Sequence, residues 1–363
     1  MHTQTIEKAL LAAAALLAAG TAQAQSSVTL YGLVDHAVNN YKAGSNAGGQ
    51  SVWKLNDGVV NGLNGSRWGV RVNEDLGGGL KAIAVLESGL SADTGALGQG
   101  GLAFGRQVFV GLSSASMGEV RLGRQYILSD STMGMTNPFG NAAVNNPGTA
   151  STNAGRNLPF WLNAPRANNV IQYQTPKLGG FSAAAQLAPG EGTADRFHGV
   201  KLGYGTGPFN AAVAYEWNES RATGDKANTS LTVGANYNFG VLKLLGGVQR
   251  NADLATGAGN GSFIGANLIV TSGAGSFAAD QINGYTLGVE IPSGPILWGI
   301  NYTGVKYEAP SGASATLGKA AFAGRYGLSK NTFLYAGFSV STGDLKTYIT
   351  EERVVQAGLR MAW

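Results

Sequence analysis

The sequence predicts an all-β chain, a 16-stranded antiparallel transmembrane β-barrel with long loops at one end and short turns at the other. Three observations lead to this prediction. Polar and apolar residues alternate with period two along many segments, turn residues bound each segment, and the connections alternate between short and long. Period-two alternation turns one face of a strand toward lipid and the other toward water, as a membrane barrel requires.

The first element is an export signal. Lys8 supplies a weak positive charge, residues 9–20 form an almost unbroken apolar run, and small residues at 21–24 suit signal peptidase cleavage after Ala24. The run is too short to cross a bilayer as a helix. We therefore expect residues 1–24 to be a signal peptide and residues 25–363 to form one barrel domain.

The composition excludes several classes of protein. Lys and Arg number 25 against 21 Asp and Glu, and a net charge of +4 is too small to indicate nucleic-acid binding. The chain has no cysteine, so an exported product has no disulfide framework. Mean hydropathy is close to zero, which is typical of a barrel whose lipid-facing and water-facing residues cancel.

Three strands show the alternation most clearly. Residues 67–73 place Trp68, Val70 and Val72 on one face. Residues 230–239 alternate in the same way, and so does the last segment, which ends at Trp363. A soluble β-sandwich also alternates, so the connections must decide between the two folds.

The connections sort into two kinds. Seven short turns are expected, at 77–79, 114–118, 177–180, 205–208, 239–240, 292–295 and 328–331. Eight long polar segments separate them, at 39–64, 91–104, 127–166, 189–196, 218–228, 251–283, 306–315 and 343–350. Eight loops and seven turns require 16 strands with both termini at one end. Short periplasmic turns and long extracellular loops are the polarity of an outer-membrane barrel.

Several motifs then resemble general porins of the neisserial and betaproteobacterial type. They lie along the whole mature chain: Val28-Thr29-Leu30-Tyr31-Gly32, Ser66-Arg67, Glu74-Asp75-Leu76-Gly77-Gly78-Gly79, Leu86-Glu87-Ser88-Gly89, Phe104-Gly105-Arg106-Gln107, Gly123-Arg124-Gln125-Tyr126 and Asn137-Pro138-Phe139-Gly140. The resemblance implies a homotrimer in the Gram-negative outer membrane, in contact with lipid and lipopolysaccharide. It also implies that the third loop, about 127–166, folds into each lumen with Pro138, Phe139 and Gly140 forming a turn.

Two features depart from the family pattern. The chain ends in Trp363 where most relatives end in Phe, and we expect the barrel-assembly machinery to read this tryptophan as its terminal aromatic signal. The third loop is poor in acid, since Asp130 is its one carboxylate. In cation-preferring relatives, acidic residues of this loop oppose a basic wall.

The candidate functional residues are charges at a pore constriction. Arg67 and Arg71 share the polar face of the second strand, and we expect both in the lumen, because a guanidinium facing lipid costs about 2–4 kcal/mol. By resemblance, Arg106 joins Arg67 on a basic wall, and Arg156 joins them from the third loop. Glu87 faces inward by its period, and so does Asp35, so some arginines could instead form ion pairs. With Asp130 nearly alone against these arginines, we predict an anion-preferring pore.

No catalytic, cofactor or metal site is expected. The two histidines of the mature chain, His36 and His198, lack the spacing of metal ligands, and no serine has a His/Asp partner pattern. We therefore expect a passive channel for small hydrophilic solutes and anions rather than an enzyme. The alternatives are a substrate-selective barrel and, in another class, a secreted all-β adhesin.

Overall fold

The structure, a computed structural model, describes residues 26–60, 62–140, 151–158, 166–254 and 268–363. The expected signal peptide and its cleavage point after Ala24 lie outside the described residues. No helix of the described part of the chain is long and apolar enough to span a membrane.

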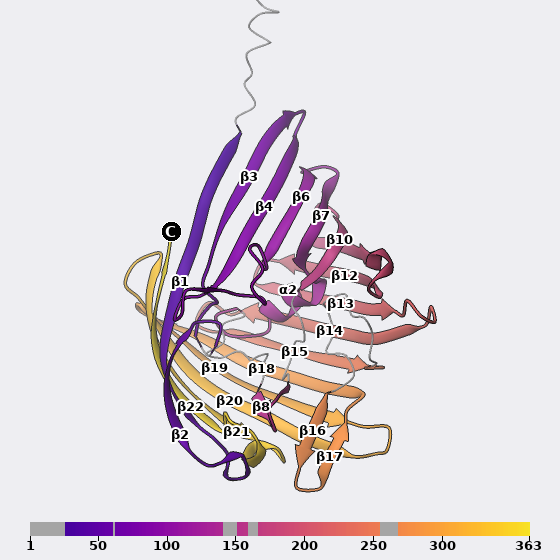
Figure 1. The fold of residues 1–363 in the computed structure, drawn as a ribbon. Helices are drawn as coiled ribbons and strands as arrows, with labels where there is room; N and C mark the ends of the chain where they lie inside the picture. Colours follow the sequence, from indigo (N-terminus) through magenta and orange to yellow (C-terminus); the bar gives the residue numbers. More distant parts are fainter. Residues whose placement is uncertain (1–25, 61, 141–150, 159–165, 255–267) are drawn as a thin grey trace, which may run out of the picture.

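Sixteen antiparallel strands form the wall of a closed barrel (Figure 1). They are β1 (Ser27–Lys42), β3 (Arg67–Gly77), β4 (Leu80–Ser91), β6 (Gln107–Ser114), β7 (Gly118–Tyr126), β10 (Arg166–Gln174), β11 (Phe181–Ala188), β12 (Arg196–Thr206), β13 (Phe209–Glu219), β14 (Lys226–Asn238), β15 (Lys243–Ala252), β18 (Gln281–Ser293), β19 (Ile296–Glu308), β20 (Ser314–Gly327), β21 (Thr332–Thr342) and β22 (Arg353–Ala362). Each pairs with the next, and β22 pairs with β1 to close the seam. The predicted fold class is confirmed.

The connections fall where the sequence predicted them. All seven short turns join neighbouring wall strands at one end, which we call the short-turn end. At the first of them Gly77, Gly78 and Gly79 all have positive φ, a conformation that residues with a Cβ rarely adopt. The opposite, long-loop end carries the eight long connections.

Some long loops contain further elements, which the sequence did not predict. Loop one, residues 43–66, contains η1 (Ser45–Ala47) and β2 (Ser51–Asp57), which extends the sheet along the C-terminal half of β1. The remaining elements are β5 (Ala96–Leu97), α2 (Leu128–Gly134), β8 (Ser151–Asn153), β9 (Arg156–Leu158), η2 (Gly190–Gly192), β16 (Ile269–Ser272), β17 (Gly275–Ala278) and η3 (Lys346–Tyr348).

Side-chain exposure follows the predicted alternation. On β14, Leu231 and Val233 are 42% and 37% exposed, whereas Ser230 and Thr232 are 2% and 0% exposed. The apolar face is therefore the outer one, as expected where lipid covers a barrel. Polar residues face an interior that loop segments partly fill.

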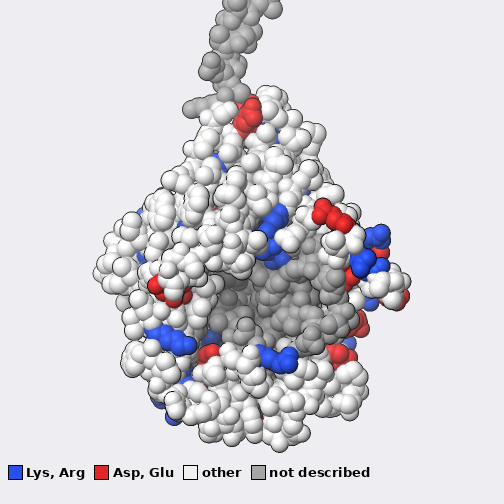
Figure 2. Space-filling model, in the orientation of Figure 1, with Lys and Arg blue, Asp and Glu red and all other residues white. Residues whose placement is uncertain are grey.

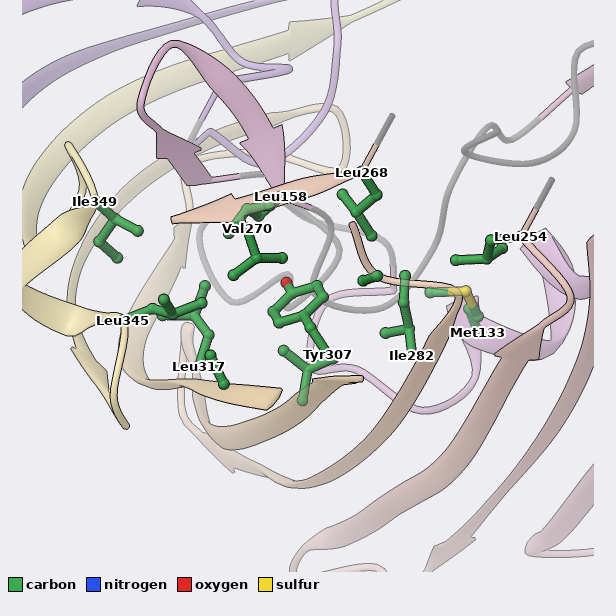
Figure 3. Packing of buried hydrophobic residues seen from close by; sticks show 13 residues of the cluster. Met133, Leu158, Leu254, Leu268, Val270, Ile282, Tyr307, Leu317, Leu345 and Ile349 are labelled. Carbon is green, nitrogen blue, oxygen red and sulfur yellow. The ribbon is translucent and has the colours of Figure 1, made fainter. Parts of the chain in front are cut away.

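An apolar cluster fills one side of the barrel at the long-loop end (Figure 3). Tyr307 of β19 and Leu317 of β20 come from the wall, and Leu158 and Val270 come from the β8–β9 and β16–β17 hairpins. The buried Asn153 amide ties these hairpins together, because its Nδ2 donates to the Thr271 carbonyl at 2.9 Å and its Oδ1 accepts from the Thr271 N–H at 2.8 Å. The β8–β9 and β16–β17 hairpins are thus joined to each other where they pack on the wall.

Candidate functional site

A buried ion pair marks the inner face of the wall formed by β3, β4 and β6. Nε of Arg106 donates to Oε1 of Glu87 at 2.8 Å, and both side chains are almost fully buried. The Tyr31 hydroxyl donates to the other carboxylate oxygen at 3.1 Å. Glu87 is therefore committed to two partners, as a buried carboxylate requires.

One tyrosine gathers two further guanidinium contacts. Arg106 Nη2 donates to the Tyr126 hydroxyl at 2.6 Å, and Nη2 of Arg166 donates to the same oxygen at 2.7 Å. The guanidinium of Arg166 also lies 4.4 Å from the centre of the Tyr126 ring. A phenol can satisfy two donors without neutralising either charge, so Tyr126 keeps two cations close together.

Arg67 completes this group, which we call the arginine cluster: Arg67, Arg106 and Arg166. Its guanidinium lies within electrostatic range of both other arginines and of Glu87. Its Nε donates to the Gly65 carbonyl at 3.0 Å. Three guanidinium groups with Glu87 as their close carboxylate leave an excess of positive charge on this wall. Low-dielectric walls focus such a field into the space beside them.

Asp130 of α2 faces the cluster from the third loop. It lies within electrostatic range of Arg166, Arg106 and Lys201. Burial raises the pKa of the Asp130 carboxyl to about 6, against the attraction of these cations. The Lys201 ammonium donates to the Ser131 hydroxyl at 2.6 Å, and a cavity of about 270 Å³ lies between the start of α2 and the inner faces of β7, β10 and β11.

Helix α2 is fixed to the opposite wall through its first turn. The fully buried Glu216 of β13 accepts hydrogen bonds from the Ser129 backbone N–H at 3.0 Å and from the Ser129 hydroxyl at 2.6 Å. Unpaired N–H groups at a helix start favour a carboxylate. The helix contacts β12, β13 and β14 and so lies along the inner wall.

The chain after α2 continues along the wall, seated on glycines. A Cβ built on Gly234 would lie 2.6 Å from Cγ2 of Thr136, and one built on Gly299 would lie 2.8 Å from Cβ of Pro138. Neither wall position could carry a side chain without displacing the loop. Residues 128–140, which we call the loop-three belt, therefore line the interior from β12 to β20.

The predicted turn at Pro138, Phe139 and Gly140 ends this belt. Phe139 and Gly140 have φ of +60° and +70°. The Phe139 backbone N–H donates to Oε1 of Glu290 at 2.6 Å, and the Arg325 guanidinium lies 5.6 Å from the ring centre of Phe139. These contacts hold a phenylalanine in a left-handed conformation that costs about 1–2 kcal/mol.

The structure brings most of the predicted constriction residues together. Arg67, Arg106, Glu87 and Asp130 share one region of the interior. Arg71 lies beside them, with its guanidinium 4.9 Å from the centre of the Tyr31 ring. Arg156 is placed differently: it begins β9, in the hairpin at the long-loop end whose neighbours include Thr271 and Ile349.

Several inward-facing cations were not predicted from the sequence. Arg166 was assigned to the end of the third loop, although it begins β10. Arg325 and Arg360 alternate with exposed Tyr326, Leu359 and Met361, so the period of two could have found them. Within the described residues, no group of three or more His, Cys, Asp or Glu could hold a metal ion.

A hollow opens on the face of the molecule drawn in Figure 2, and Lys and Arg side chains lie at its rim together with acidic ones. The charges at this rim are mixed.

Comparisons with known proteins agree with this architecture. Residues 9–345 match the family model described as Gram-negative porin. The chain is 33% identical to an outer membrane porin protein of Bordetella pertussis, over 91% of this chain and 93% of that protein. It is 38% identical to outer membrane porin protein 32 of Delftia acidovorans, over 68% and 70%. Among solved structures, the anion-selective porin from Comamonas acidovorans superposes with a TM-score of 0.71 at 28% identity, over 93% of this chain and 100% of that one.

Proposed function

The chain belongs to the Gram-negative porin family, and we propose that its arginine cluster makes it an anion-preferring member. As a porin it is an outer-membrane channel for passive diffusion, not an enzyme. Its selectivity then depends on the charges at the narrowest part of the water-filled lumen. In this proposal Arg67, Arg106, Glu87 and Asp130 form part of that selectivity filter.

One observation carries the proposal: Tyr126 holds Arg106 and Arg166 on a single hydroxyl, with Arg67 beside them. Holding like charges close together costs free energy, so this arrangement is more typical of a functional site than of a stabilising contact. Glu87 and Asp130 offset part of this charge, and the remainder attracts anions and repels cations over the short distance of a constriction. The anion-selective relative from Comamonas acidovorans supports the same sign.

Loop three supplies the opposite side of the constriction in this proposal. The loop-three belt occupies the wall from β12 to β20, so solutes pass between it and the arginine cluster, in which Arg67 begins β3, Arg106 directly precedes β6 and Arg166 begins β10. Arg71 extends the basic surface toward the short-turn end. Arg156 lies at the mouth of the channel rather than at the selectivity filter. Arg166 takes the position beside Arg67 and Arg106 that was predicted for Arg156.

The apolar outer face of the barrel and the membership of the porin family together indicate which partners the protein contacts. Large apolar side chains such as Val110 and Leu287 are 55% and 65% exposed, as lipid contact requires. We propose a homotrimer in contact with phospholipid and lipopolysaccharide, assembled by the barrel-assembly machinery through Trp363 after removal of residues 1–24.

The test is the reversal potential of the purified channel in a planar bilayer with a potassium chloride gradient. We expect an anion-preferring sign for the parent channel and a shift toward zero in Arg67→Gln. The matched control is Arg250→Gln, because exposed Arg250 shares the outer face of β15 with Val248 and lies outside the lumen. A cation-preferring parent channel, or equal shifts in the two variants, would refute the proposal.

A further inference from the structure

A second loop enters the barrel beside the arginine cluster. We call residues 62–66, near the end of loop one, the loop-one turn. Leu63 is 2% exposed and packs against Ala37 of β1, Ala323 of β20 and Tyr335 of β21, all on the inner face of the wall. A segment that begins at the long-loop end therefore lies inside the barrel.

Asp35, fully buried on the inner face of β1, fastens this turn. Its Oδ2 accepts hydrogen bonds from the backbone N–H groups of Leu63 at 3.0 Å and Asn64 at 2.7 Å. Its Oδ1 accepts from the Tyr335 hydroxyl at 2.5 Å. A buried carboxylate is tolerated only with such donors, so the turn and Asp35 depend on each other.

Asp57 fastens the same turn from the other side. Its carboxylate accepts from the Ser66 backbone N–H at 3.2 Å and from the Val59 N–H at 2.9 Å. It also accepts from the Ala92 N–H of loop two at 3.3 Å. Two buried carboxylates, on β1 and β2, thus hold a short stretch of backbone in place through main-chain donors.

The turn reaches the arginine cluster directly. The Gly65 carbonyl accepts the hydrogen bond from Nε of Arg67, and a Cβ built on Gly65 would lie 3.6 Å from Nη1 of Arg106. At its other side, Phe139 of the loop-three belt packs against the cluster that contains Leu63. The loop-one turn therefore joins the arginines to the belt along β1, β21 and β20.

We propose that the loop-one turn is a second wall of the constriction and that Asp35 and Asp57 are positioning residues for Arg67. The inference rests on the proposed anion selectivity and deepens it. In this arrangement the two carboxylates set the direction of the Arg67 guanidinium through the Gly65 carbonyl. Releasing the turn widens the passage and frees Arg67 to move away from Arg106.

The test uses variants that keep every formal charge. Tyr335→Phe removes one hydrogen bond of Asp35, and Leu63→Ser removes the apolar anchor of the turn. We expect both to raise the single-channel conductance and to shift the reversal potential toward zero. Leu63→Met is the matched control, because a volume-conserving apolar substitution keeps the anchor. This variant should retain the conductance and reversal potential of the parent channel.

Asp35→Asn separates positioning from simple electrostatics. Loss of a negative charge near the pore would by itself increase anion preference, whereas loss of the turn decreases it. We expect the decrease, together with higher conductance. An increase in anion preference at unchanged conductance would overturn the positioning role.

Folding is checked by the heat-dependent mobility of each variant in gel electrophoresis, and conductance is measured on channels that pass this check. Parent-like conductance and reversal potential in folded Tyr335→Phe and Leu63→Ser would overturn the inference. A cation-preferring parent channel would refute the proposed selectivity instead, while the conductance comparison would still decide whether the turn lines the passage.

Discussion

Nε of Arg106 lies 2.8 Å from Oε1 of Glu87, in a wall where both side chains are almost fully buried. Removing one member of such a pair leaves the other charged and unpaired. For Glu87→Gln we therefore predict a folded state less stable by about 3–5 kcal/mol, the range for broken buried pairs. The surviving channels should show stronger anion preference, because one carboxylate beside the arginine cluster is gone.

Heat-dependent gel mobility measures the stability, and the reversal potential measures the selectivity. Glu119→Gln is the matched control, since Glu119 pairs with Arg121 and both side chains are partly exposed. Exposed pairs contribute up to about 1 kcal/mol. Equal loss of stability in the two variants would contradict the buried role of Glu87.

The raised pKa of the Asp130 carboxyl leads us to predict that the ion selectivity of the channel depends on pH. Its pKa is raised to about 6 by burial, so the carboxyl is ionised at neutral pH and becomes neutral as the pH falls through 6. The negative charge opposes the arginine cluster only when it is present. Anion preference should therefore rise when the pH is lowered from about 7.5 to about 5, a range that brackets this pKa by about one unit or more on each side.

The reversal potential measured at several pH values tests this prediction. Asp130→Asn should show high anion preference throughout and no step near the pKa of the parent carboxyl. A step of the same size in Asp130→Asn would mean that another group titrates.

The strands were predictable because their cause is local. Alternation between Leu231 and Thr232 reflects lipid on one side and water on the other, and the glycines at 77–79 mark a turn by conformation alone. No long-range contact is needed to read either signal. For that reason the strand number and the seven turns followed from the sequence.

The site was predictable only where it lies on strands. The period-two alternation of their strands predicts that Arg67 and Glu87 face inward. Arg67 belongs to the arginine cluster, and Glu87 pairs with Arg106 of that cluster. Loop residues such as Arg156 and Leu63 carry no period, and their positions depend on partners far away in the chain. Leu63 is held by Tyr335, and Asn153 binds Thr271, pairings that a single sequence does not reveal.

The loop-three belt packs directly against Gly299. A larger side chain at this position therefore tests whether the belt sets the width of the pore. A Cβ at this position would lie 2.8 Å from Cβ of Pro138 and 2.9 Å from Cζ of Phe139. Gly299→Val should push the belt into the lumen, lower the single-channel conductance and cost about 1–3 kcal/mol of stability through overpacking.

Gly327→Val serves as the control for this variant, because the nearest atoms to a Cβ at Gly327 lie at 3.8 Å. Conductance in planar bilayers is the measurement. An unchanged conductance in Gly299→Val would show that the belt does not border the passage.

Trp363 closes the barrel seam on Gly32. The Trp363 N–H donates to the Gly32 carbonyl at 3.1 Å, and the Gly32 N–H donates to the Trp363 carbonyl at 3.3 Å. The indole lies over Gly32, since a Cβ there would be 2.3 Å from Cζ2 of the ring. Gly32→Val should therefore displace the indole and destabilise the seam by about 1–3 kcal/mol.

Trp363→Phe separates packing at the seam from recognition of the terminal aromatic. A smaller ring still fits over Gly32, so this variant should assemble in the outer membrane as the parent does, whereas Gly32→Val should yield less heat-resistant barrel although its terminal residue is intact. The amount of folded barrel in isolated outer membranes measures both effects. Parent-like yield and heat resistance in Gly32→Val would show that the indole does not depend on its glycine seat, because the backbone bonds alone would then suffice to hold β22 against β1.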